Sequence, residues 1–270
     1  MFSNTMTHVE VYYTPPENID STAGILKITG QEAHHVRNVV RHTSGDKAIV
    51  VDGGGKAYWV TLSIGPQGII TGTIEKEEPG WGESKTTIGV IIPPLKGHRM
   101  DTVIEKGTEL GVSSFYIPNT KNAVARVTAS KLDRWHRIAL AAMKQCCRSV
   151  CPTILTFPEL EETLTEINKA GADIFYADKG KPALCQMTPN ERLLCFARPN
   201  GHLWCNNTSQ HQDTRVVVAV GPEGGFSDGE ITTLNNYGGI PFGLGLRRLR
   251  SDTAVIAALA QIIWLSGEDT

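Results

Sequence analysis

The pattern of apolar residues changes once along the chain, and this change constrains the fold more than any other feature. Before residue 75, short runs such as Ile25–Ile28, Ala57–Ile64 and Ile69–Ile74 are separated by glycine turns, which is typical of antiparallel strands. After residue 86, strands alternate with helices, and Asp173–Ala177 and Arg215–Val220 are continuously apolar, as buried parallel strands are. We therefore expect a small β-barrel or twisted sheet, followed by an α/β domain with a parallel sheet.

Length, charge and cysteine usage exclude several classes of protein. The 270 residues include 26 Lys and Arg against 28 Asp and Glu, so RNA binding would need a local basic patch. The N-terminus shows no signal peptide, and the twelve apolar residues Ala254–Leu265 fall short of the ~20 of a membrane span. This segment should be a buried helix, and we expect a cytoplasmic protein. The six cysteines form no CxxC pair, so we expect reduced thiols, with metal binding as the weaker alternative.

The clearest motif is Val220–Ile231 (VGPEGGFSDGEI), where a buried strand runs into a glycine loop and then a helix. Ser227 and Glu230 are spaced as a capping box, and Phe226 and Ile231 as a hydrophobic staple. Glycines let main-chain amides approach a ligand closely, and ligands of parallel sheets bind beyond the carboxyl ends of strands. The loop is a candidate ligand site, with a tight turn that binds nothing as the alternative. It has neither GxGxxG nor P-loop spacing, which disfavours a dinucleotide or a nucleoside triphosphate.

A second glycine loop, Gly243–Ala254 (GLGLRRLRSDTA), also joins a strand to a helix, with Ser251 as the expected N-cap. Its three arginines stand directly before the positive end of the helix dipole, which repels them. An anionic or polar nucleic-acid partner explains this placement, and a solvated basic turn is the alternative. Asp252 partly offsets the charge.

A third cationic segment, His34–His42 (HHVRNVVRH), lies in the N-terminal part. Thr29 and Glu32 are spaced as a capping box that opens a short helix, on which Arg37 and Arg41 are i, i+4 neighbours. Such a face suits phosphates, and a merely solvated face is the alternative. Metal binding is not expected, because adjacent histidines diverge on a helix.

Taken together, these segments resemble the bacterial small-subunit ribosomal RNA uridine-N3 methyltransferase family (RsmE), within the SPOUT class of S-adenosylmethionine enzymes. The pairing of GPEGG with a downstream LGxRxLRxxTA is specific to it. The matching stretches are AHHVRNVVRHTSGD (33–46), MDTVIEKGTELGV (100–112), MKQCCRSVCP (143–152), VGPEGGFSDGEI (220–231) and LGLRRLRSDTA (244–254).

The resemblance implies a fold and partners. It implies a PUA-like RNA-binding barrel at 1–76, a linker at 77–85 and a SPOUT domain at 86–270. The SPOUT domain would be α/β, with helices on both faces of a parallel sheet and a C-terminal trefoil knot around the S-adenosylmethionine site. Relatives are homodimers that act on 16S rRNA in the small ribosomal subunit. Relatives often carry an Arg where this chain has Glu10 and Val11, and residues 179–213 match nothing.

The resemblance also assigns cofactor contacts by position, with Ala177–Asp178 as a poorer third match. The expected contacts are Gly221, Pro222, Glu223, Gly224, Gly225, Leu244, Gly245, Leu246 and Leu249. The expected RNA contacts are His35, Arg37, Arg41, Arg247 and Arg250.

Two of these residues are candidates for catalysis, and no metal is expected. Arg250 would stabilise the uridine anion, and Glu223 would accept its proton. Asp252 or solvent are alternative acceptors, and Glu223 could instead hold loop amides.

Other functions stay open. A SPOUT enzyme could act at another RNA position or on a ribose 2′-hydroxyl. A non-catalytic RNA-binding or assembly factor is a second alternative, although the intact loops argue against it. An oxidoreductase lacks its glycine fingerprint.

Overall fold

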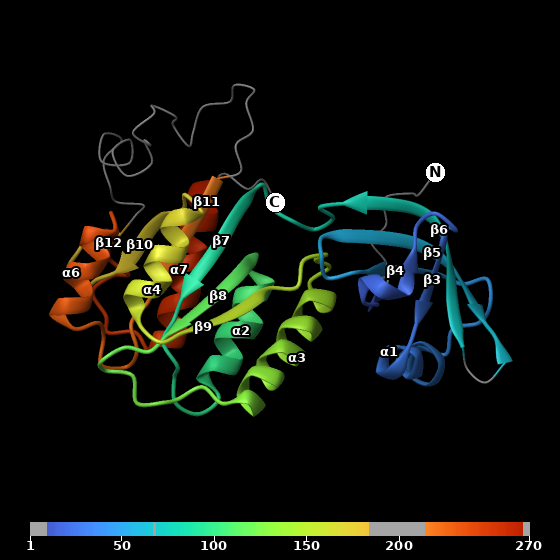
Figure 1. Cartoon of the computed structure of the whole chain (residues 1–270), viewed down its shortest axis with the longest axis horizontal. Coiled ribbons are helices and arrows are strands. Elements are labelled where there is room, and N and C mark those ends of the chain that lie inside the picture. The colour runs from blue at the N-terminus through green and yellow to red at the C-terminus, as the bar shows by residue number, and fades with distance from the viewer. Residues whose placement is uncertain (1–9, 67–68, 184–213, 267–270) are drawn as a thin grey trace, which may run out of the picture. The chain divides into compact units, whose positions relative to one another are not determined.

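The computed structural model describes residues 10–66, 69–183 and 214–266, which divide into two compact units (Figure 1). The first unit comprises the chain up to Glu83 together with Leu140–Cys151. The second unit comprises Ser84–Ala139 and the chain from Pro152 onward. Each unit is built around a sheet of its own. Helix α3 (Ala129–Gln145) contributes residues to both units.

The first unit contains a six-stranded sheet in the order β1-β4-β5-β6-β3-β2. Strand β1 runs parallel to β4, and the other pairs are antiparallel. The strands are β1 (Val11–Tyr13), β2 (Ile19–Asp20), β3 (Ile25–Ile28), β4 (Lys47–Val51), β5 (Lys56–Ile64) and β6 (Ile70–Pro79). Three short helical segments complete it: η1 (Pro16–Asn18), α1 (Gly30–His34) and η2 (His35–Val40).

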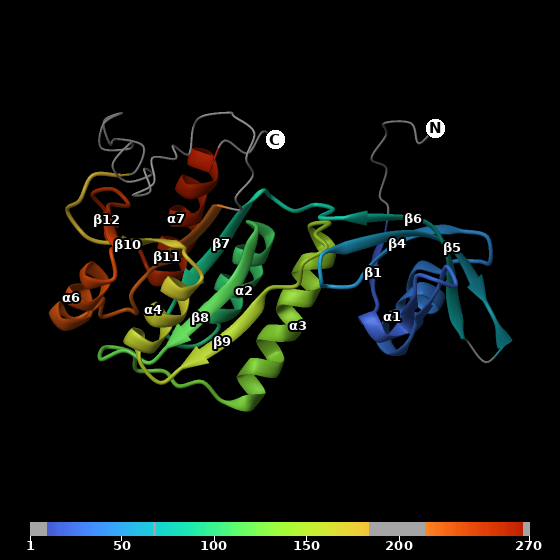
Figure 2. The same cartoon turned by 45° about the horizontal axis from the view of Figure 1, so that its top comes forward.

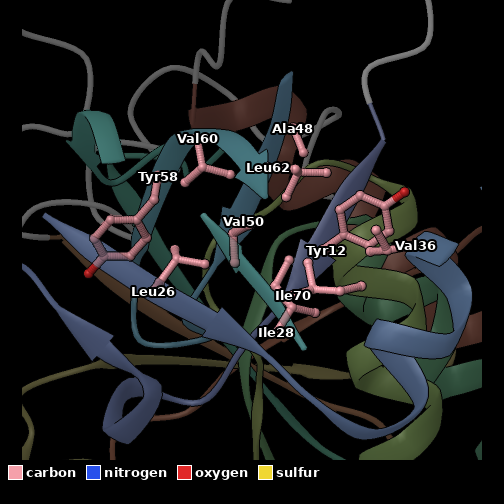
Figure 3. Close-up of a cluster of buried hydrophobic side chains, with 10 residues drawn as sticks. All are labelled: Tyr12, Leu26, Ile28, Val36, Ala48, Val50, Tyr58, Val60, Leu62 and Ile70. Carbon is pink, nitrogen blue, oxygen red and sulfur yellow. The ribbon is translucent and has the colours of Figure 1, made fainter. Parts of the chain in front are cut away.

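A cluster of ten buried side chains fills this unit, and Figure 3 shows them converging from the strands and from the helical segment. They alternate along the strands, as Val60 and Leu62 do in β5, because successive residues of a strand point to opposite faces. Val36 of η2 joins the same cluster. The β-rich domain expected from the sequence is therefore present, with a mixed sheet, this apolar core and a second, smaller buried cluster that includes Val51 and Met143.

The segment formed by α1 and η2 differs from the single short helix that the sequence predicts. Thr29 precedes α1 without a side-chain cap, because Glu32 instead accepts from the backbone amide of Tyr13 and pairs with Lys144. Residues 35–40 form a π-helix, and Arg41 follows it with a left-handed backbone (φ 63°). Arg37 and Arg41 are therefore not i, i+4 neighbours on one α-helical face, and that expectation was wrong.

Residues 77–85, which the sequence predicts to be a linker, do not form a separate segment between the two units. Strand β6 continues to Pro79, and residues up to Glu83 belong to the first unit. The Glu83 carboxylate accepts from the buried Arg148 guanidinium (Nη2 to Oε2, 2.7 Å) and from the amides of Ser149 and Val150. This ion pair holds Leu140–Cys151 in the first unit, which no local sequence pattern revealed.

The second unit contains six parallel strands in the order β12-β10-β11-β7-β8-β9. They are β7 (Thr86–Ile91), β8 (Val112–Pro118), β9 (Thr153–Phe157), β10 (Asp173–Ala177), β11 (Thr214–Ala219) and β12 (Ile240–Phe242). The helices are α2 (Arg99–Glu109), α3, α4 (Leu160–Lys169), α6 (Asp228–Asn236) and α7 (Ser251–Ser266).

Helices cover both faces of this sheet, as expected (Figures 1 and 2). Leu164 of α4 and Leu234 of α6 pack with Tyr176 and Val217 on one face. Helices α2 and α7 contact each other and cover the other face, where Gly107 of α2 lets Phe115 approach. The apolar segment Ala254–Leu265 lies in α7, with Val255, Leu259 and Ile262 fully buried, and no helix of the described residues is long and apolar enough to cross a bilayer.

Candidate functional site

A cavity of about 510 Å³ lies at the carboxyl ends of β10, β11 and β12, within the second unit. Two glycine loops line it, which we name the GPEGG loop (residues 220–226) and the arginine loop (residues 243–250). The strand end at Tyr176–Lys179 forms a third wall. Of the residues expected to act here, those that line the cavity are Gly221, Pro222, Glu223, Gly224, Gly225, Leu244, Gly245, Arg247, Leu249 and Arg250. Its volume is in the range of small-molecule sites.

The glycines of the GPEGG loop are needed by the loop itself. A Cβ on Gly221 would lie 2.8 Å from the amide nitrogen of Phe226, and a Cβ on Gly224 would lie 2.9 Å from the Cβ of Asn122. Gly225 has a left-handed backbone (φ 73°), which a side chain would strain. The loop therefore folds tightly on itself and against Asn122.

The carboxylate of Glu223 is held by the loop that precedes α2. Its Oε1 accepts from the Arg99 guanidinium (Nη1, 2.7 Å) and from the Lys96 amide (3.2 Å). Burial alone would raise the pKa of Glu223, but hydrogen bonds from backbone amides and from Arg99 outweigh it and hold the pKa below its ordinary value. Its Oε2 is buried and accepts no hydrogen bond from the described residues. Glu223 is thus an ionised group whose first role is to tie two loops together.

The loop that follows β8 braces the GPEGG loop from the other side. The Asn122 side-chain amide donates to the carbonyl oxygens of Gly225 (3.0 Å) and Gly224 (3.3 Å). The Lys121 amide donates to Glu230 Oε1 (2.8 Å), and Glu230 closes the expected capping box with Ser227. Sequence reasoning missed Asn122, Lys96 and Arg99, because no motif links residues more than a hundred positions apart.

The arginine loop leaves its charges in solvent. Arg247, Arg248 and Arg250 are exposed, and none has a carboxylate partner within the described part of the chain. The side chain of Leu246 is fully exposed and does not line the cavity, unlike that of Leu249.

The start of α7 also departs from expectation. The Arg250 carbonyl accepts from the Ala254 amide (2.7 Å), so Arg250 and not Ser251 occupies the N-cap position. Asp252 does not line the cavity, and its buried Oδ1 accepts no hydrogen bond from any described residue.

The other expected site residues belong to the first unit. His35, Arg37 and Arg41 are all exposed on or just after η2. Within residues 10–66, 69–183 and 214–266, no group of three or more His, Cys, Asp or Glu side chains is arranged to hold a metal ion. Cys146, Cys147 and Cys151 are free thiols, and Cys185, Cys195 and Cys205 lie outside the described residues.

Comparison with known proteins fits this geometry. Residues 82–263, which carry both loops, match the model of an RNA methyltransferase domain. The chain belongs to the RNA methyltransferase family. Residues 28–77 match the PUA domain of RNA methyltransferases, which agrees with the β-rich first unit.

Two relatives match most of this chain. The ribosomal RNA small subunit methyltransferase E of Synechocystis is 30% identical over 92% of this chain and 75% of its own length. The protein of that name from Bacillus subtilis is 27% identical over 89% of this chain and 90% of its own length. A Neisseria gonorrhoeae ribosomal RNA small subunit methyltransferase E, solved with bound S-adenosyl methionine, has a TM-score of 0.77 and 25% identity, covering 96% of this chain and 98% of that one.

Proposed function

We propose that this chain transfers a methyl group from S-adenosylmethionine to N3 of a uridine in the 16S rRNA of the small ribosomal subunit. One observation carries the proposal: the GPEGG loop and the arginine loop, which are separate in sequence, line one cavity at the carboxyl edge of the parallel sheet. Family membership and the similarity to ribosomal RNA small subunit methyltransferases support the same activity.

The cavity suits S-adenosylmethionine in size and in the chemistry of its walls. Main-chain amides and carbonyls of two glycine loops can satisfy the polar groups of a nucleoside without bulky side chains between. The unpartnered Oε2 of Glu223 offers an acceptor to a cationic or amino group. Gly221–Gly225, Leu244, Gly245 and Leu249 would hold the cofactor, which supplies a methyl group on a positively charged sulfur.

Arg250 is the residue that we assign to charge stabilisation. Uridine N3 is a poor nucleophile until it loses its proton, and the negative charge then spreads to O2 and O4. A guanidinium beside either oxygen would stabilise that anion, lower the proton affinity of N3 and keep the base in line for attack on the methyl carbon. Arg250 lines the cavity, is exposed, and has no carboxylate partner among the described residues, so its charge is available for this role.

The proton from N3 passes to solvent in this proposal. Glu223 was a candidate base, but its lowered pKa and its ion pair with Arg99 make it a weak proton acceptor. Asp252 does not line the cavity. Glu223 is therefore assigned to binding and to loop order, and Arg250 to catalysis.

Further properties belong to the proposal. The first unit would bind RNA through His35, Arg37, Arg41 and neighbouring groups, while Arg247 and Arg250 would contact RNA near the cavity. We also propose a trefoil knot; the passage of the chain from the edge strand β12 back to α7, which packs on α2 and β11, supports it. A homodimer in the cytoplasm completes the proposal.

The deciding experiment maps methyl groups on 16S rRNA from cells that lack this protein. Loss of one 3-methyluridine, restored by the wild-type gene, is the expected result. Calorimetry with S-adenosylmethionine accompanies it. If the methyl group that is lost lies on another atom of the rRNA, that atom is the target and uridine N3 is not. If the protein binds no S-adenosylmethionine at millimolar concentration, it is an RNA-binding factor and not an enzyme.

A further inference from the structure

The exposed cations of the second unit are unevenly distributed. Many of them follow the carboxyl ends of strands, and none of these has a carboxylate partner among the described residues. After β7 comes Lys96, after β8 come Lys121 and Arg126, after β10 come Lys179 and Lys181, and after β12 come Arg247, Arg248 and Arg250. By contrast, Lys106 and Lys169, within helices α2 and α4, are paired with glutamates of their own helices.

These cations share one edge of the sheet, since all its strands are parallel. The strand order β12-β10-β11-β7-β8 places Lys96, Lys121 and Arg126 beyond the GPEGG loop, on the side away from the arginine loop. Four strand spacings of ~4.8 Å separate β12 from β8, so the cationic edge extends over roughly 20 Å. It therefore continues well past the cavity itself.

The loop after β8, residues 119–128, contacts the GPEGG loop on one side and solvent on the other. Its inner side is fixed by Asn122 on the GPEGG loop and by the Lys121 amide on Glu230. Its outer side carries Lys121, Val124 and Arg126, all exposed. A cation on a loop braced in this way keeps a fixed position relative to the cavity. These exposed cations, which have no carboxylate partner among the described residues, suit an extended polyanion better than a small anion, because they follow the ends of several different strands.

We propose that Lys96, Lys121 and Arg126 form a second contact surface for the phosphodiester backbone of the substrate RNA, which we name the β7–β8 edge. This inference rests on the proposed function, because it takes RNA as the substrate. The β7–β8 edge holds the strand that flanks the target nucleotide, while the arginine loop contacts the nucleotide itself. Its lysine and arginine side chains would contact phosphate oxygens and so position the RNA backbone.

The test replaces two of these charges and measures the salt dependence of RNA binding. Lys121→Ala/Arg126→Ala removes two exposed side chains and leaves Asn122 and the Lys121 amide in place. The matched control is Lys85→Ala/Arg215→Ala, a lysine and an arginine that are exposed and lie at the amino ends of β7 and β11, at the opposite edge. The probe is a 16S rRNA fragment that the wild-type protein methylates.

We expect the edge variant to bind RNA on the order of tenfold more weakly at fixed salt. The slope of log K against log salt should lose about 1.4–1.8, the share of two phosphate contacts, while the control keeps the wild-type slope. Affinity for S-adenosylmethionine should not change in either variant, because none of these side chains lines the cavity.

Two results would overturn the inference. One is a salt-dependence slope in the edge variant equal to that of the wild-type protein. The other is an equal loss of RNA affinity in the control variant, which would mean that the net charge of the protein, and not the position of these residues, causes the effect. Failure of the proposed function is distinguishable, because the wild-type protein would then bind no cofactor or methylate no uridine in the same assays.

Discussion

The GPEGG loop and the arginine loop line the same cavity, yet one is braced by its neighbours and the other is open to solvent. Asn122, Arg99 and the Lys96 amide hold the GPEGG loop from two sides. In the arginine loop, Leu246 and all three arginines are exposed. A preformed wall lowers the entropic cost of binding a small molecule, and free guanidinium groups suit a large anionic partner. The GPEGG loop therefore shapes the cavity, and the arginine loop supplies charge.

The largest effect is expected from the arginine loop. Arg250→Ala should slow single-turnover methylation by about 10²–10³-fold, in the range seen when one group that stabilises a developing anion is removed. Cofactor affinity should stay within about twofold, because the GPEGG loop is untouched. Rapid quench with labelled cofactor measures the first quantity, and calorimetry the second.

Arg248→Ala is the matched control, since it removes the same charge from an exposed position two residues away. Equal slowing by the two variants would mean that the loop acts through its total charge. Arg250 would then have no specific place in the chemistry.

The second effect tests the brace on the GPEGG loop. Gly224→Ala places a methyl group where the Cβ of Asn122 would be 2.9 Å away, and neither backbone can absorb it freely. Overpacking of this size costs about 1–3 kcal/mol, so cofactor binding should weaken about tenfold or more. Calorimetry on the purified variant measures it.

A double-mutant cycle identifies the cause. Asn122→Gly removes both the Cβ and the two hydrogen bonds, so in that background Gly224→Ala should cost much less. Strictly additive losses would show that Gly224 is needed for reasons other than its contact with Asn122.

The third effect is a pH dependence that only the braced loop should have. The pKa of Glu223 is lower in the folded protein than the ordinary glutamate pKa of about 4.3. The ionised carboxylate therefore stabilises the fold fully at pH values above about 4.3, and this stabilisation is lost as the pH falls through the lowered pKa. Glu223→Gln should unfold about 1 kcal/mol more easily at pH 7. Urea unfolding between pH 7 and about pH 3.5 should show the two proteins converging on the acid side. A constant gap at every pH would assign the loss to packing instead of charge.

Local patterns predicted most elements of the fold. Strands β3 and β10 have the bounds that alternation and continuous apolar runs indicate, and the Ser227–Glu230 capping box forms as its spacing predicts. Strand β9 and helix α4 were missed, because Thr153–Phe157 is short and Leu160–Lys169 is rich in polar residues. The resemblance to a known family, and not a local pattern, placed the two loops at one site.

Contacts between distant segments were beyond the reach of those patterns. The Glu83–Arg148 pair, which ties Leu140–Cys151 to the first unit, and the Asn122 contacts to Gly224 and Gly225 join residues that are 65 and 102–103 positions apart. The backbone conformation was equally hidden: the helix switches to a π-helix at His35, where Val36 enters the core, and Arg41 is left-handed. Local sequence patterns cannot predict these contacts and backbone conformations, since they depend on tertiary packing.

The smallest expected change is that of Leu246→Ala, which distinguishes the two leucines of the arginine loop. Leu246 is fully exposed and Leu249 lines the cavity, although the motif treats them alike. Leu249→Ala should weaken cofactor binding about tenfold, the value of removing a buried apolar contact of one to two kcal/mol. Leu246→Ala should change it less than about twofold, because the Leu246 side chain is fully exposed and does not line the cavity. Equal losses in calorimetry would mean that the arginine loop turns Leu246 toward the cofactor on binding, and that this loop, unlike the braced GPEGG loop, changes its conformation when the cofactor binds.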